Sequence, residues 1–237
     1  MPTAKQYRKY RRRSAKAKSK YTKRSMSYNT VRQIARKVLF KNSETKVFDS
    51  NVGKIEYNHN SPQLLELNSA ARMPARGTGP DNRIGDSIRK VGTRHTMLIG
   101  GKADRTNITY RLQYVTYPRD ATYAYSDFFI NKTGNALLDR MNTDLVKIVK
   151  TIYIKPQKSG ILHNTSGGAL ASPREYTIAK KVWLPSKHLI NFPSGASDEP
   201  RNRKFGVIIT AYDAYGTLTS DNIAYIQHLV SNYFKDI

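Results

Sequence analysis

Residues 107–119 read NITYRLQYVTYPR, and apolar and polar side chains alternate along this stretch. From residue 108 to residue 116, every second position holds Ile, Tyr, Leu, Tyr or Thr, and the positions between them include Thr, Arg and Gln. Side chains two apart share one face of a β-strand, so this period predicts a strand with one face toward a core. The β-branched and aromatic content favours the same structure, and Pro118 marks its end.

Seven other stretches of the chain have a similar composition, with Gly, Pro, Asn and Asp between them. They predict strands at residues 46–57, 63–68, 87–101, 145–156, 174–185, 204–216 and 222–234. Helical patterns are few in this region, and only residues 134–142 (GNALLDRMN) are expected to form one or two helical turns. Short strands without long helices between them indicate a sandwich or barrel rather than a parallel sheet with crossover helices.

The connections between the predicted strands narrow the choice of topology. Residues 161–173 and 192–204 are too long for tight hairpins, and long connections favour Greek-key crossovers. Eight strands in two Greek keys form a jelly roll. An immunoglobulin-type sandwich is the main alternative, although the Cys–Trp–Cys pattern of that fold is missing. We therefore predict an all-β fold, a single eight-stranded jelly-roll sandwich over residues 44–237 with a disordered basic N-terminal arm. The arm spans residues 1–43, and residues 1–28 are the part expected to be disordered.

The predicted arm concentrates the positive charge of the chain. Residues 5–24 read KQYRKYRRRSAKAKSKYTKR and contain eleven Lys or Arg and no carboxylate. Residues 1–43 hold 15 of the 41 basic residues and none of the 17 acidic ones, which leaves 26 − 17 = +9 on the rest of a chain with net charge +24. A segment with this much like charge and so few apolar residues is expected to be disordered when unbound.

A short amphipathic helix is one possibility for residues 30–40. Val31, Ile34, Ala35, Val38 and Leu39 fall at the spacing of one helix face, and the residue at position 29 or 30, Asn or Thr, is a candidate cap. An irregular continuation of the arm is the alternative.

The charge and the interleaved tyrosines of the arm indicate binding to a single-stranded nucleic acid. Lysine and arginine release counterions from phosphates, which gives tight, salt-sensitive and sequence-independent binding. Phenol rings can stack on unpaired bases. The predicted nucleic-acid-binding residues are Lys5, Arg8, Lys9, Arg11, Arg12, Arg13, Lys16, Lys18, Lys20, Lys23 and Arg24, with Tyr7, Tyr10 and Tyr21. A basic run is also typical of nuclear import signals, and the predicted import residues are Arg8, Lys9, Arg11, Arg12, Arg13, Lys16, Lys18 and Lys20.

Catalytic and metal-binding patterns are weak in the sequence. The absence of cysteine excludes disulfides and thiolate sites, the five histidines are scattered, and no nucleotide-binding Gly-rich loop or nucleophile elbow occurs. We predict no metal, no cofactor and no enzymatic activity, and a meeting of Asp127, Asp213 and Asp221 in space is left open. No stretch is apolar over eighteen residues, so no membrane insertion is expected, and the N-terminus lacks the apolar core of a secretory signal.

Three stretches resemble the capsid proteins of circovirus-like viruses, whose genome is a circle of single-stranded DNA. Residues 77–101 (GTGPDNRIGDSIRKVGTRHTMLIGG) are similar to a Gly-rich loop that leads into a long strand in those proteins, with Arg83, Gly85, Asp86 and Ile88 at the matching positions. Residues 205–222 resemble the late hairpin of that family and residues 225–236 its last strand.

The resemblance implies a single jelly roll that assembles into an icosahedral shell, with the basic arm inside against a single-stranded DNA genome. RNA as the packaged nucleic acid is the alternative. The smallest shell of this kind, T=1, has about 60 copies. The resemblance also implies host nuclear import receptors as partners and a location in the virion and the host nucleus. The alternative function is a basic DNA-binding shuttle protein that does not assemble. A third possibility is a nuclease or transferase that holds nucleic acid through its basic residues.

Overall fold

The computed structural model describes residues 27–102, 105, 108–130, 133–155, 177–193, 198–201, 203–216 and 218–236, except for the side chains of residues 36 and 41. The chain divides into two units, Met1–Ser43 and Glu44–Ile237, and each is described by itself. The first unit contains helix α2 (Tyr28–Asn42). The residues predicted to form the disordered arm before that helix lie outside the described part of the chain.

The second unit consists mainly of β-strands. Its strands are β1 (Lys46–Asn58), β2 (Gln63–Glu66), β3 (Ser87–Gly101), β4 (Ile108–Tyr117), β5 (Phe129–Ile130), β6 (Arg140–Met141), β7 (Lys147–Ile154), β8 (Thr177–Pro185), β9 (Leu189–Asn191), β10 (Lys204–Asp213) and β11 (Asn222–Asp236). Two short helical segments accompany them, η1 (Ala70–Arg72) and α3 (Tyr125–Phe128). All eight predicted strands are present within a few residues of their expected bounds.

The eight main strands form two antiparallel sheets. One sheet has the order β1-β11-β3-β8, with β9 also paired to β3, and the other has the order β2-β10-β4-β7. Consecutive main strands thus lie in alternate sheets, except β4 and β7, which pair in one sheet. The last two main strands, β10 and β11, return between earlier ones, which is the double Greek key of a jelly roll. The immunoglobulin alternative would place the first two strands side by side in one sheet. The predicted fold class is therefore confirmed.

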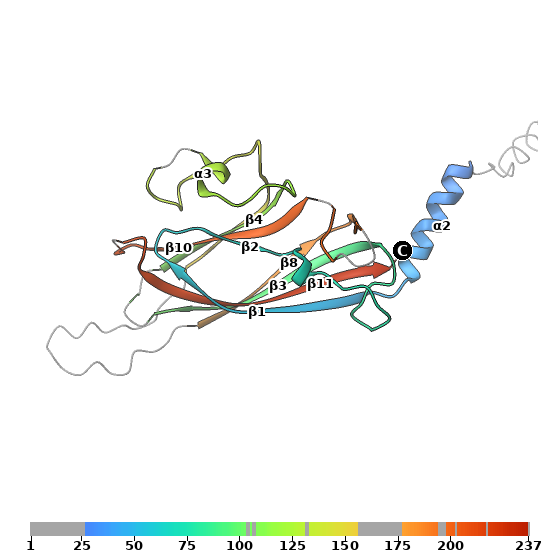
Figure 1. Ribbon diagram of the computed structural model, residues 1–237, viewed down its shortest axis with the longest axis horizontal. Helices are drawn as coiled ribbons and strands as arrows, with labels where there is room; N and C mark the ends of the chain where they lie inside the picture. Colours follow the sequence, from blue (N-terminus) through green and yellow to red (C-terminus); the bar gives the residue numbers. More distant parts are fainter. Residues whose placement is uncertain are drawn as a thin grey trace, which may run out of the picture. The chain divides into compact units, whose positions relative to one another are not determined.

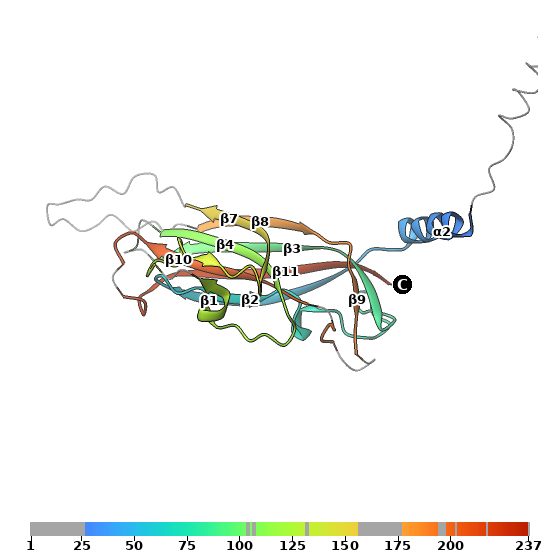
Figure 2. The ribbon, with the colours of Figure 1, turned by 90° about the horizontal axis from the view of Figure 1, so that it is seen from above.

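The sheets form two layers in Figure 1, with β1, β3, β8 and β11 below and β2, β4 and β10 above. In the view from above, β7 and β8 lie along one side of the sandwich, and β1 and β2 lie along the other (Figure 2).

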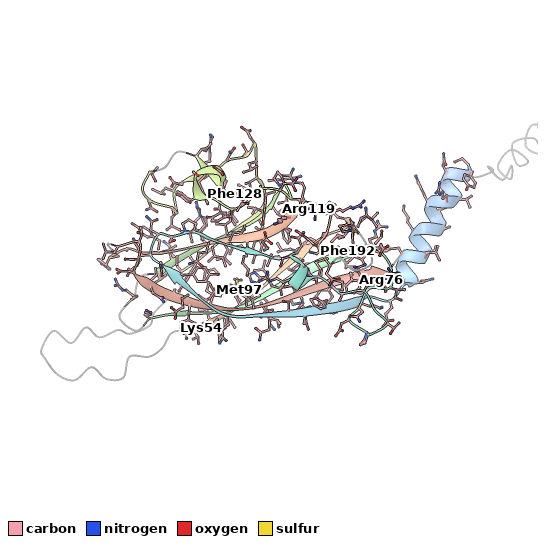
Figure 3. All side chains as sticks on the ribbon, in the orientation of Figure 1. Lys54, Arg76, Met97, Arg119, Phe128 and Phe192 are labelled. Carbon is pink, nitrogen blue, oxygen red and sulfur yellow. The ribbon has the colours of Figure 1, made fainter. Side chains whose placement is uncertain are left out.

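The main core lies between the two sheets. The alternating side chains of β4 supply Ile108, Tyr110, Leu112 and Tyr114, as the period of this strand predicts. Figure 3 shows Met97 of β3 between the layers. Strands β10 and β11 contribute further fully buried aliphatic side chains, among them Val207, Ile209, Ile226 and Val230.

A second apolar cluster covers the opposite face of β4. Phe128, Phe129 and Met141 pack there against Val115 and Ile208, on the far side of the sheet from Met97 (Figure 3). Both faces of β4 are therefore buried, although the alternation of its sequence indicated only one. The covering segment is the connection between β4 and β7, which contains α3, β5 and β6.

The predicted helix at residues 134–142 is wrong. Turns and the short strand β6 occupy this stretch, and Gly134 has a φ of +79°. The buried Arg111 of β4 donates from its guanidinium to the carbonyl oxygens of Ala136, Leu137 and Asp139. These carbonyls bond to a side chain instead of to amides one helical turn ahead, so a strand residue determines the conformation of the connection.

A chain of polar side chains crosses the core between four strands. Tyr57 Oη lies 3.0 Å from Nε2 of His228, Nδ1 of His228 lies 3.0 Å from Nε2 of His95, and Nδ1 of His95 lies 3.0 Å from Oη of Tyr114. All four residues are at most 1% exposed. Two neutral imidazoles between two hydroxyls make all three hydrogen bonds, because each ring then has one donor and one acceptor.

We predict that this series of buried hydrogen bonds makes the sandwich less stable in mild acid. Burial lowers the pKa of His95 to about 3, with contributions from His228 and Arg72, and burial lowers the pKa of His228 to about 4, with a contribution from Arg72. Unfolded histidine titrates near pH 6.5, so below that pH the unfolded state binds more protons. The free energy of unfolding should fall from about pH 6.5 toward pH 4, by at most about 1.4 kcal/mol per pH unit for each histidine.

Urea denaturation between pH 5 and pH 7.5 measures this slope. The double variant His95→Gln and His228→Gln should show a flatter slope than wild type, and the exposed control His188→Gln should keep the wild-type slope. A wild-type stability that does not change between pH 7 and pH 5 would contradict the prediction.

Candidate nucleic-acid interface

The predicted nucleic-acid-binding side chains lie outside the described residues. This holds for all eleven basic residues from Lys5 to Arg24, for Tyr7, Tyr10 and Tyr21, and for the whole import set. Their roles stay predictions. The structure describes the chain from Ser27 onward, where the basic segment continues into α2.

Helix α2 is amphipathic, and its apolar side chains are exposed. Val31, Ile34, Val38 and Leu39 are between 45% and 70% exposed. The predicted caps are wrong by two or three positions, because Oγ of Ser27 accepts a hydrogen bond from the amide of Thr30, as an N-cap side chain does. No acidic residue occurs between Ser27 and Ser43, so the helix adds to the basic charge of the arm.

Arg83, in the loop motif that resembles circovirus-like capsids, is fully buried. Its Nε donates to the carbonyl of Pro74 at 3.2 Å and its Nη1 to the carbonyl of Gly85 at 2.6 Å. The guanidinium lies 3.9 Å from the ring centroid of Phe192, so it is packed against an aromatic face as well. A side chain with no exposed surface is not available to phosphates, and Arg83 therefore organises the loop.

The other residues of the motif surround this arginine. Asp86 lies 3.6 Å from Nη1 of Arg83 and 3.5 Å from Nη1 of Arg76, and Asp198 lies 3.4 Å from Nη2 of Arg83. Ile88 is buried in a small apolar cluster with Met73, Ile190, Phe192 and Phe234. The motif thus joins the loop before β3 to the segment around residue 198, across more than a hundred positions of sequence.

Unpaired cations collect along the β7–β8 side of the sandwich. Both strands are edge strands, and within their bounds the sequence has no acidic residue. Five exposed lysines occur here, at positions 147, 150, 155, 180 and 181, and no ion pair between described residues includes them. The sequence alone indicates only an excess charge of +9 for residues 44–237. The local signal that could have located these lysines is their spacing without acidic residues in KIVKTIYIK and AKKVW.

The acidic residues that could have formed a catalytic cluster do not all meet. Asp213 and Asp221 share Arg105, whose guanidinium nitrogens lie 3.4 Å and 3.3 Å from their carboxylates. The contacts of Asp127 are to other residues, Ser126 and Asn142. In the described part of the chain, no group of three His, Cys, Asp or Glu side chains could hold a metal ion. The described helices also include none that is long and apolar enough to cross a membrane.

The chain has no match among protein-family models or among curated proteins. Three solved chains that are similar to it come from viruses. A chain of infectious bursal disease virus, Gx strain, is 11% identical with a TM-score of 0.30, and the match covers 81% of this chain and 32% of that one. A chain of desmodium yellow mottle tymovirus is 8% identical with a TM-score of 0.30, over 80% of this chain and 86% of that one.

A chain of the T13 infectious bursal disease virus particle is 9% identical with a TM-score of 0.26, over 81% of this chain and 32% of that one. This chain thus spans 32% of the infectious bursal disease virus chains that it matches. These scores are low, so the assignment of the jelly roll rests on the order of its strands and not on these likenesses.

We predict that Arg83 is required for stability and that its exposed neighbour Arg76 is not. Arg83→Met removes two hydrogen bonds from a buried guanidinium to carbonyls and its ion pairs with the partly exposed Asp86 and Asp198, and should lower the free energy of unfolding by about 2–4 kcal/mol. Arg76→Met removes only an exposed ion pair with the same Asp86 and should cost less than about 1 kcal/mol. Urea denaturation of both variants measures the difference, and equal losses would show that Arg83 has no special structural role.

Proposed function

We propose that this chain is a viral capsid protein that assembles into a closed shell and packages a single-stranded nucleic acid through its basic arm. The observation that carries the proposal is the attachment of an acid-free segment with 15 basic residues to a jelly-roll sandwich. The residues of the loop motif add the resemblance to circovirus-like capsids, and with it DNA as the genome. A T=1 shell would contain about 60 copies.

The charge of the arm suits this role in magnitude. Fifteen basic residues on each of about 60 chains give 15 × 60, or about 900, positive charges, enough to neutralise about 900 phosphates. Binding of this kind is independent of sequence, because the arm segment carries charge without a rigid scaffold that would aim side chains at base edges. A packaging protein needs this property, since it must bind the whole length of a genome.

The sandwich offers surfaces for contacts between copies. Among the described strands, β7 pairs only with β4, and it exposes Ile148, Val149 and Tyr153, which are 40%, 48% and 59% exposed. An edge strand with exposed apolar side chains tends to bind another protein surface. Lys147 and Lys150 lie on the same strand, and their charge opposes contact between two such edges until a polyanion is present. Assembly would therefore be coupled to the genome.

The basic run would also serve as the address for host nuclear import receptors, since it matches the composition of import signals. Residues 8–20 carry this part of the proposal. In this proposal one segment serves both import and packaging.

We predict that replacing the eleven Lys and Arg residues of positions 5–24 by Gln will abolish most packaging while the sandwich stays folded. Four of the 15 basic residues of the arm segment remain, so the nucleic acid protected per chain should fall by about two thirds or more. Nuclease protection and the ratio of nucleic acid to protein measure packaging, and circular dichroism measures folding.

Replacing the exposed lysines at positions 155 and 180 by Gln is the control, and it should reduce packaging by no more than its share of the charge. Full protection of nucleic acid by the eleven-residue variant would overturn the role of the arm. The same variant, expressed in cells, should stay in the cytoplasm if residues 8–20 are the import signal.

A further inference from the structure

The outer face of the β1-β11-β3-β8 sheet carries a cluster of aromatic and basic side chains that the arm does not explain. The Trp183 cluster consists of Trp183 and Lys181 on β8, Arg94 on β3 and Tyr233 on β11. Trp183 pairs with Arg94 in the strand register, and Tyr233 pairs with Gly92, which lies two positions before Arg94 on β3. The ring centroids of Trp183 and Tyr233 are 5.2 Å apart at 76°, and the guanidinium of Arg94 lies 5.1 Å from the ring centroid of Tyr233.

The tryptophan ring is held in place and is still accessible. A Cβ at Gly92 would lie 2.4 Å from the Trp183 ring, so the ring rests on the backbone of β3 at a position where only glycine leaves room. Trp183 nevertheless stays 42% exposed. The same arrangement recurs on this sheet, where Tyr225 of β11 lies over Gly100. A large ring that is fixed from below and open to solvent loses little conformational freedom when a flat partner stacks on it.

The surroundings of the cluster are positively charged. Arg94 and Lys181 are exposed, and neither β3 nor β8 contains an acidic residue. The acids that face outward from this sheet are on β1, two strands away from Arg94. Asp49 lies in register with Arg94 with Ser231 of β11 between them, and Glu56 lies 3.8 Å from Lys54. A ligand at the Trp183 cluster would therefore meet an exposed aromatic surface with two cations beside it.

We propose that the Trp183 cluster binds single-stranded nucleic acid, with an unpaired base stacked on Trp183 and the adjacent phosphates held by Arg94 and Lys181. This inference rests on the proposed function, because it takes the packaged nucleic acid as the partner. It adds a second contact, on the rigid sheet, to the one made by the arm. Aromatic platforms between cations are the combination that proteins use for unpaired bases, and duplex DNA offers no free base face.

A neighbouring subunit is the other partner that this face could take, because Leu98 and Leu229 on the same sheet are 38% and 39% exposed. Trp, Tyr and Arg are common at protein interfaces too, and lysine is the residue of the cluster that favours nucleic acid. Centres of protein interfaces are depleted in lysine, whereas Lys181 flanks the exposed ring here with no carboxylate beside it on β3 or β8.

Intrinsic fluorescence tests the proposal, because Trp183 is the one tryptophan of the chain. The full-length protein is titrated with a 20-residue oligothymidylate, and in parallel with inorganic polyphosphate of the same charge. Stacking should quench the emission with oligothymidylate, whereas polyphosphate should bind the basic arm without comparable quenching. Trp183→Leu should weaken binding of labelled oligothymidylate by about 5- to 150-fold and leave polyphosphate binding unchanged.

Matched charge variants show whether the cations at the cluster matter more than cations elsewhere on the sandwich. Arg94→Gln with Lys181→Gln should reduce the amplitude of the quenching by oligothymidylate. Lys147→Gln with Lys150→Gln, which removes the same charge from β7, should leave this amplitude unchanged. Equal effects of the two pairs would overturn the assignment of Arg94 and Lys181.

The remaining outcomes separate this inference from the proposed function. Salt-reversible binding of oligothymidylate without any change in emission would overturn the stacking contact and leave the proposed function intact. No binding of oligothymidylate at all would overturn both. A change in emission that follows protein concentration alone, without nucleic acid, would identify the face as a contact between subunits and overturn the inference.

Discussion

The structure depends on the burial of the inner faces of two central strand pairs against each other. Strands β3 and β11 run antiparallel over thirteen paired positions, and β4 and β10 do the same over ten. The aliphatic and tyrosine side chains between these pairs are the main source of stability, since apolar burial is the largest favourable term in folding. Polar links inside the layer, such as the hydrogen bond of 2.8 Å between Thr93 and Asn232, fix the register of β3 against β11. Because the inner faces are fully used, binding is left to the outer faces, the strand edges and the N-terminal segment.

The basic residues of the body divide into a structural group and a free group. Arg83 and Arg111 are buried and hold loops by bonding to backbone carbonyls. Lys46 and Lys204 pair with Asp236 and Glu66, so the charge of these side chains is already compensated. The exposed cations outside the ion pairs of the described residues include the lysines of the β7–β8 side and Arg94 beside Trp183. Cations at the surface are screened by water and counterions, which lowers the cost of a high net charge.

The sequence predicted the strands well because their evidence is local. The alternation in residues 108–116 and the turn residues between the apolar runs are enough to place each strand, and the lengths of the connections favoured the jelly roll. The helix at residues 134–142 was wrong because the decisive partner, Arg111, is more than twenty positions away in sequence. The meeting of His95 with His228, and of Trp183 with Arg94 and Tyr233, depends on cross-strand register, which no local pattern reveals. For the loop motif, the resemblance indicated the right residues, but only the structure shows that Arg83 is buried.

The mass of the full-length protein in solution with a single-stranded oligonucleotide, measured by light scattering and electron microscopy over a range of salt concentrations, tests the central claim most directly. The account predicts closed particles of uniform diameter, many times the mass of one 27.0 kDa chain. A chain that stays monomeric at every salt and protein concentration would contradict it, even if it bound the oligonucleotide, and would favour the shuttle protein.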